Sequence, residues 1–142
     1  MALEDLRIYK TALQAADLIL QESKSWDHRS ISLIGDQLVR AVVSVTNNIS
    51  EAYARVATGE RVQLLMYAEG SSLEARNAIV HAIQLGCIRP EIGREAQKLL
   101  ATTSIGIIEF AWSIASRDPG YKSPMKAQLE KRHNGIMKAR TR

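Results

Sequence analysis

Five polar residues repeat at helical spacing in two neighbouring segments and could do chemistry together. They are Ser44, Asn48 and Glu51 in the first segment, and Ser71 and Glu74 in the second. Steps of three and four residues place each set on one face of a helix. Two carboxylates facing one another in a bundle could act as a general acid and a general base. The same residues could instead form a buried polar network that fixes the helix register, provided each carboxylate is hydrogen-bonded, paired or protonated.

The histidine spacing argues against a metal site. Di-iron bundles combine a Glu from each of two helices with Glu-x-x-His from each of the other two. Neither His28 nor His81 has a Glu three residues before it, and only Glu130 and His133 have that spacing. Motifs for dinucleotides, phosphate loops, zinc proteases and serine hydrolases are also missing. We therefore expect a protein that is not an enzyme and has no catalytic residue, metal or cofactor, and we interpret the five polar residues as a structural network.

Four long segments with a helical repeat must position these residues. Hydrophobic residues make up 46% of the chain and aromatic residues only 5%, a composition that favours helix over sheet. The predicted helices span residues 3–22, 30–55, 58–85 and 90–116, and Gly, Pro and polar residues separate them. Short connections between long helices predict an all-α fold, an antiparallel up-down-up-down four-helix bundle over residues 1–116.

Residues 117–142 differ sharply in charge from the predicted bundle. Residues 1–116 contain 11 Lys or Arg and 13 Asp or Glu, whereas residues 117–142 contain 8 and 2, so the net charges are −2 and +6. This segment is poor in apolar residues, and we expect a flexible basic C-terminal tail with at most two helical turns around residues 125–132. Because Lys and Arg contacts to phosphates dominate nucleic-acid affinity, the tail predicts attraction to polyanions, although it could simply aid solubility.

The candidate nucleic-acid contacts are the basic residues of the tail and three arginines of the predicted helices. The arginines could equally be ordinary surface charges, and aromatic side chains for base stacking are scarce, so we expect no sequence-specific reading of bases. The candidates are Arg40, Arg55, Arg61, Arg117, Lys122, Lys126, Lys131, Arg132, Lys138, Arg140 and Arg142.

The N-terminal residues and the apolar runs bear on localisation. The first ten residues lack a basic region followed by an apolar one, and Cys87 is the single cysteine. No stretch approaches the ~18 to 20 uninterrupted apolar residues of a membrane span. We therefore expect a cytoplasmic protein that does not insert into membranes.

Several short motifs together resemble one known family. They are Leu6-x-Ile8-Tyr9-Lys10-x-Ala12, Gln37-Leu38-x-Arg40-Ala41, Ser44-Val45-x-x-Asn48-Ile49-x-Glu51, Gly70-Ser71-x-x-Glu74 and Gln84-Leu85-Gly86-Cys87-Ile88. Over residues 3–116 the chain resembles the four-helix-bundle family of ribosomal-RNA intervening-sequence proteins and accessory variability proteins of diversity-generating retroelements. It departs at Ala52 and Ala54, in a stretch where that family is rich in Gly.

The resemblance implies a non-catalytic four-helix bundle, often a ring-shaped homopentamer. Its retroelement branch implies binding of RNA or DNA and of a partner reverse transcriptase. From this resemblance and the basic tail we expect an oligomeric, nucleic-acid-binding accessory protein of that branch. The alternative is an intervening-sequence-type protein-interaction module that binds no nucleic acid. Trp26 and Trp112 would be its anchors if they were exposed, although we expect both to lie in or beside the core.

Overall fold

The computed structural model describes all 142 residues, and all of its regular elements are helices. It contains no strand, which confirms the predicted all-α class. The elements are η1 (Leu3–Asp5), α1 (Arg7–Ser23), α2 (His28–Ser30), η2 (Ile31–Gly35), α3 (Asp36–Ala54), α4 (Thr58–Gln84), α5 (Pro90–Ser116) and α6 (Pro124–Arg140).

Local signals in the sequence set several helix boundaries. Pro90 lies in the first turn of α5, where its missing N–H costs nothing. Gly86, which follows the C-cap residue Leu85 of α4, has a φ of +71°, and the Cys87 amide then donates to the Ala82 carbonyl at 2.9 Å. The Asp27 side chain accepts the Ser30 amide at 2.7 Å and caps α2.

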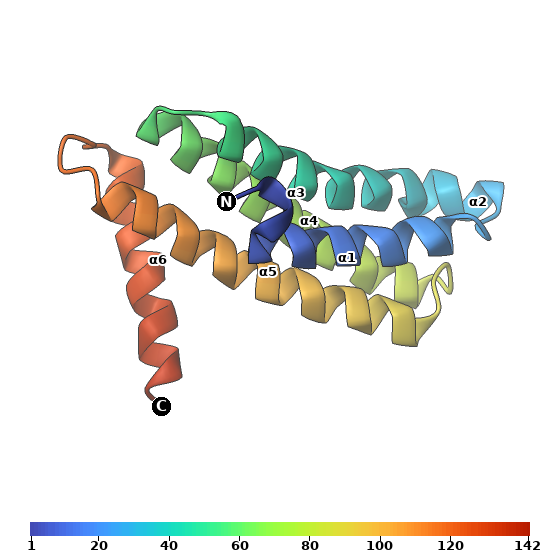
Figure 1. Cartoon of the computed structure of the whole chain (residues 1–142). Helices are drawn as coiled ribbons and strands as arrows, with labels where there is room; N and C mark the ends of the chain where they lie inside the picture. The colour runs from blue at the N-terminus through green and yellow to red at the C-terminus, as the bar shows by residue number, and fades with distance from the viewer.

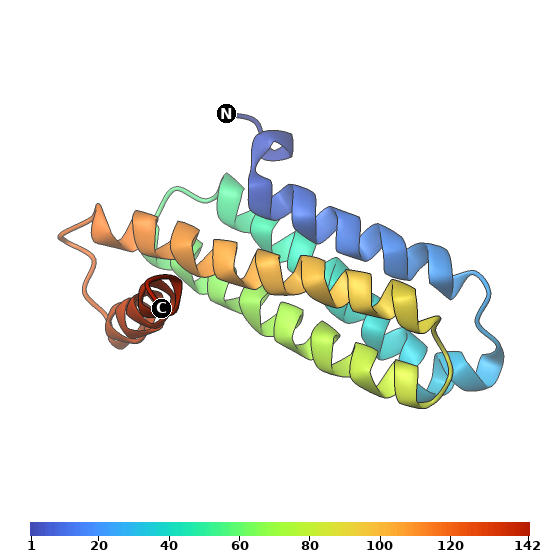
Figure 2. The ribbon, with the colours of Figure 1, turned by 90° about the horizontal axis from the view of Figure 1, so that it is seen from below.

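Four of the helices pack along one another and enclose the core. Helix α1 packs on α3 and α5, and α4 packs on the same two helices. Successive long helices run in opposite directions along the bundle (Figure 1), and the view turned by 90° shows the same four helices side by side (Figure 2). Many core residues are alanines, which let the helices approach closely, and larger apolar side chains such as Ile19, Leu65 and Ile107 fill the centre.

Helix α5 is long and apolar enough, by length and composition alone, to cross a membrane. Its buried positions include Leu100, Ile107, Ala111 and Ala115, and α5 packs on α1 and α4. Burial of this apolar face within the bundle accounts for the composition of α5, because a core helix passes the same test.

The segment that leads into α3 differs from the uninterrupted helix predicted over residues 30–55. Residues Ile31–Gly35 form one π-helical turn between α2 and α3. A methyl group added to Gly35 would lie 2.7 Å from a ring carbon of Trp26, so glycine allows the indole to lie close against this turn. Trp26 and Trp112 are both half-buried and pack against the core, so neither is the exposed anchor considered from the sequence.

The prediction of a flexible C-terminal tail is wrong, because residues 124–140 form the 17-residue helix α6. Figure 1 shows α6 running steeply across the direction of the bundle, and Figure 2 views it nearly along its axis. The Ser123 side chain caps its first turn by accepting the Lys126 amide at 3.3 Å. Leu129 is only 1% exposed, which shows that α6 has an apolar face of its own.

Candidate nucleic-acid interface

Helix α6 is held on the bundle by one face. Met125, Leu129 and Ile136 pack against the core at intervals of four and seven residues. The His133 ring stacks on Trp112 of α5 with the ring centroids 5.8 Å apart. This spacing follows the helical repeat, so the apolar residues of the segment already indicated a docked helix. The high net charge of the segment instead favoured the prediction of a flexible tail.

Two of the predicted phosphate contacts are used inside the molecule. The Arg132 guanidinium donates to both carboxylate oxygens of Glu69 on α4, at 3.1 and 2.6 Å, and Arg140 pairs with Glu109 of α5. Glu69 is 5% exposed, and its carboxylate raises the pKa of Arg132. A bidentate pair to a buried carboxylate holds α6 in place, so Arg132 and Arg140 are less available to a phosphate than the sequence suggested.

Lys126 is also engaged locally. Its ammonium donates to the carbonyls of Asp118 and Tyr121 at 3.3 and 3.0 Å and lies over the Tyr121 ring. Hydrogen bonds from Thr58 and from the Gly120 amide hold the pKa of Asp118 below its usual range. These contacts order the turn between α5 and α6.

The remaining basic residues of this segment are exposed and make no ion pair. Lys131 and Lys138 are separated by seven residues and therefore share one side of α6, whereas Arg142 follows the end of the helix at Arg140. Arg117 and Lys122 lie beside the turn that precedes it. The three ion pairs of the structure involve Arg89, Arg132 and Arg140, so these five cations keep their charge unneutralised.

The three helical arginines are not brought together. Arg40 is exposed on α3 and Arg55 is exposed directly after its end, and the 15 steps along the chain from one to the other correspond to about 22 Å along the helix axis. Arg61 is half-buried: its Nε donates to the Ala52 carbonyl at 3.3 Å, and its guanidinium lies over the Phe110 ring. Arg61 therefore has a packing role, and only Arg40 and Arg55 are free to meet a ligand.

The predicted polar network is smaller than expected. The Ser44 and Ser71 hydroxyls lie 2.8 Å apart, and the Asn48 amide donates to the Ser44 hydroxyl and carbonyl. Glu51 and Glu74 are exposed, so their predicted burial is wrong. Glu51 and Glu74 each follow a network residue by three positions, and a step of three residues on a helix falls about 60° short of a full turn. This offset is enough to place both carboxylates outside the interface, in solvent.

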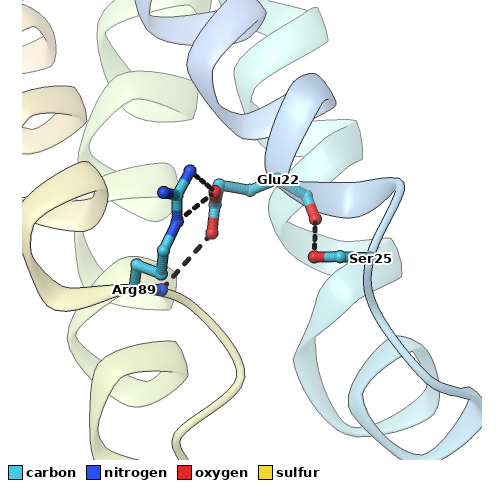
Figure 3. Close-up of polar contacts among 3 residues, drawn as sticks. All are labelled: Glu22, Ser25 and Arg89. Carbon is cyan, nitrogen blue, oxygen red and sulfur yellow. Dashed lines mark hydrogen bonds and ion pairs between the residues drawn. The ribbon is translucent and has the colours of Figure 1, made fainter.

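A different carboxylate forms the most extensively bonded polar site. Figure 3 shows Glu22, at the end of α1, facing Arg89 before α5. Glu22 is 7% exposed; it accepts the Arg89 amide at 3.3 Å and the guanidinium Nε and Nη2 at 2.8 and 2.5 Å. The hydrogen bonds from Arg89 lower the pKa of Glu22, against the opposing effect of burial, and raise that of Arg89. This pair ties α1 to the start of α5, where the helix dipole also favours a negative charge.

Another group of basic residues was not singled out from the sequence. Arg76 of α4 and Arg94 and Lys98 of α5 line one shallow depression together with Gln97 and Ala101. None of the three cations makes an ion pair. Arg94 and Lys98 are one helical turn apart, and this spacing alone is weak evidence for a basic cluster. Arg76 joins them only because α4 packs on α5.

No group of three or more His, Cys, Asp or Glu side chains is arranged to hold a metal ion. Fold and site together define an all-α bundle that carries a docked basic helix on its side. Residues 4–108 match the model of a family described as 23S rRNA-intervening sequence protein. The chain belongs to this family, as its motifs predicted. No curated protein matches the sequence.

Proposed function

We propose that this protein is a non-enzymatic nucleic-acid-binding scaffold that contacts RNA phosphates through α6 and the turn before it. The observation that carries the proposal is the set of exposed, unpaired cations Arg117, Lys122, Lys131, Lys138 and Arg142. A docked helix presents these charges without the entropy cost of ordering a free tail. Lysines and arginines spaced along a helix match a phosphate backbone and confer little base specificity.

The wider proposal follows the family resemblance. The α1, α3, α4 and α5 helices form an up-down-up-down four-helix unit, and several copies act together in the cytoplasm as a ring-shaped homopentamer that assists a reverse transcriptase. With a net charge of +4 for each chain, an oligomer would concentrate positive potential and bind a polyanion multivalently. Light scattering on the purified protein tests this part, because a pentamer has five times the mass of the 15.8 kDa chain.

The test of RNA binding compares two variants with the same charge change. The α6 variant is Lys131→Gln/Lys138→Gln/Arg142→Gln, and the control is Arg7→Gln/Lys10→Gln/Arg29→Gln, which alters three exposed cations without ion pairs elsewhere. Fluorescence anisotropy with a labelled duplex RNA is recorded between about 50 and 200 mM salt. We expect the salt slope to fall by about 0.9 for each lost phosphate contact in the α6 variant and to stay unchanged in the control.

Two results would contradict the proposal. An absence of RNA binding at the lowest salt would exclude the function and favour the protein-interaction alternative. Equal losses in both variants would show that only net charge matters and that α6 has no special role.

A further inference from the structure

A groove lies between α4, α5 and α6 on the outside of the four packed helices. It has a volume of about 460 Å³, and its lining includes Leu73 of α4, Ile105 and Ile108 of α5, and Gly135, Ile136 and Ala139 of α6. Leu73 and Ile105 remain 46% and 42% exposed. Gly135 and Ala139 on the α6 side are small, which keeps the groove open. The floor is thus an aliphatic strip that no side chain of this chain covers.

The groove continues into the basic depression described above. The two share Arg76 and Ala101, and the depression adds Arg94 and Lys98. The single carboxylate that lines either hollow is Glu69, and the ion pair with Arg132 at 2.6 Å neutralises it. The continuous hollow therefore combines an apolar floor with three unpaired positive charges at one end. A concave surface of one sign concentrates its potential, which favours an anionic ligand.

We propose that this hollow binds an amphipathic α-helix of a partner protein. The apolar side chains of that helix lie on the aliphatic strip formed by Leu73 and Ile105, and its Asp or Glu side chains lie beside Arg76, Arg94 and Lys98. Helices that occupy grooves use apolar residues spaced by three, four and seven positions, and this chemistry matches an aliphatic floor. Acidic residues on one flank complement the cations and fix the direction of the bound helix.

The character of the floor favours a protein over a nucleic acid. No Phe, Tyr or Trp lines the groove or the depression, so bases would find no aromatic surface for stacking. Arg117, Lys122, Lys131, Lys138 and Arg142, the cations proposed to bind RNA, line neither hollow. The inference therefore goes beyond the proposed RNA-binding function, and the two can fail separately.

The test uses a designed acidic amphipathic peptide of about five helical turns, or about 18 residues, with leucines on one face and glutamates on its flanks. A scrambled peptide of the same composition, without the apolar face, is the control. Binding to the full-length protein is measured by anisotropy, and the methyl signals of Leu73 and Ile105 are followed by NMR. We expect the amphipathic peptide to bind at least about tenfold more tightly than the scrambled one and to shift both methyl signals.

Two variants separate the charge from the apolar contribution. Arg94→Glu/Lys98→Glu and Ile105→Glu change exposed side chains, and each is expected to weaken peptide binding at least about tenfold. The matched control Arg7→Glu/Lys10→Glu reverses two exposed cations on α1 and should leave binding nearly unchanged.

Three outcomes would overturn the proposal. The first is equal binding of the two peptides, or no methyl shift with either. The second is a shift of the Leu73 and Ile105 methyls by duplex RNA alone, which would make the hollow part of an RNA interface. The third is an oligomer whose mass falls to that of a monomer in the Ile105→Glu variant, which would identify a second copy of the chain as the occupant.

Discussion

Glu22 shows how one residue can join segments far apart in the sequence. It was not singled out from the sequence because its partner, Arg89, lies 67 residues away. The buried pair of Glu69 could not be predicted from local spacing for the same reason, since its partner, Arg132, is 63 residues away. Ser44, Asn48 and Ser71, in contrast, share a regular repeat, and three of the five predicted network members do meet in the structure.

The lowered pKa of Glu22 predicts how stability depends on pH. Because its pKa in the folded state lies below the usual 4.5, its stabilising effect is fully present above pH 4.5 and is lost as the pH falls through the lowered pKa. We expect Glu22→Gln to lower the Tm at pH 7 and to flatten the fall in Tm below pH 4.5. Thermal unfolding followed by circular dichroism checks this, with Glu95→Gln as an exposed control. An unchanged acid slope would show that the Arg89 pair adds no stability.

Substitution by Ala should change the stability in opposite directions at Gly35 and at Gly70. A methyl group at Gly35 would lie 2.7 Å from the Trp26 ring, so Gly35→Ala should destabilise the protein by about 1 to 3 kcal/mol. No atom lies within 4 Å of a methyl group added at Gly70 in α4, so Gly70→Ala should stabilise by about 0.5 to 1 kcal/mol. Urea unfolding measures both. Destabilisation by both variants would contradict the packing argument.

Contacts between elements explain why α3 and α4 keep their register. The Ser44–Ser71 hydrogen bond joins these helices at a half-buried position. Ser44→Ala should lower the free energy of unfolding by about 0.5 to 1.5 kcal/mol, because it removes the hydroxyl that bonds to Ser71 and to the Asn48 amide, while Asn48 keeps its bond to the Ser44 carbonyl. Glu51→Gln should change it by less than about 0.5 kcal/mol, since Glu51 is exposed. A larger effect at Glu51 than at Ser44, in urea unfolding, would restore the predicted role of the carboxylate.

Helix α6 depends on docking more than on its own composition. Helix α6 has 17 residues, five of which are Lys or Arg, and a helix of this length is only marginally stable in isolation. Its buried face must therefore stabilise it. Leu129→Ala should weaken docking by about 2 to 5 kcal/mol and speed amide exchange in α6 more than in α3 or α4. Hydrogen exchange read by mass spectrometry measures this. Ala127→Gly is exposed on α6 and separates lost helix propensity from lost docking. Equal exchange in the native protein and Leu129→Ala would contradict a docked α6.

At the scale of the whole molecule, the bundle and α6 should be separable. Deletion of residues 117–142 removes α6 but leaves the contacts among α1, α3, α4 and α5. It also deprives the buried Glu69 of Arg132 and uncovers one face of Trp112. We expect a cooperative unfolding transition at a lower Tm, because the deletion removes the buried Leu129 side chain and the pair between Glu69 and Arg132. Loss of cooperativity, seen by circular dichroism, would show that α6 belongs to the folding unit.

The sequence alone determined the all-α class, the approximate helices and the family, because the helical repeat and the Gly and Pro breaks act over a few residues. Tertiary structure decided the state of α6, whose apolar stripe becomes stable only against α5 and α4. It also decided which carboxylates are buried: Glu22 and Glu69 are buried, and Glu51 and Glu74 are exposed. These outcomes depend on partners more than 60 residues away and on small differences in helix rotation. Local spacing shows neither which distant residue a side chain will pair with nor how a packed helix is rotated about its own axis.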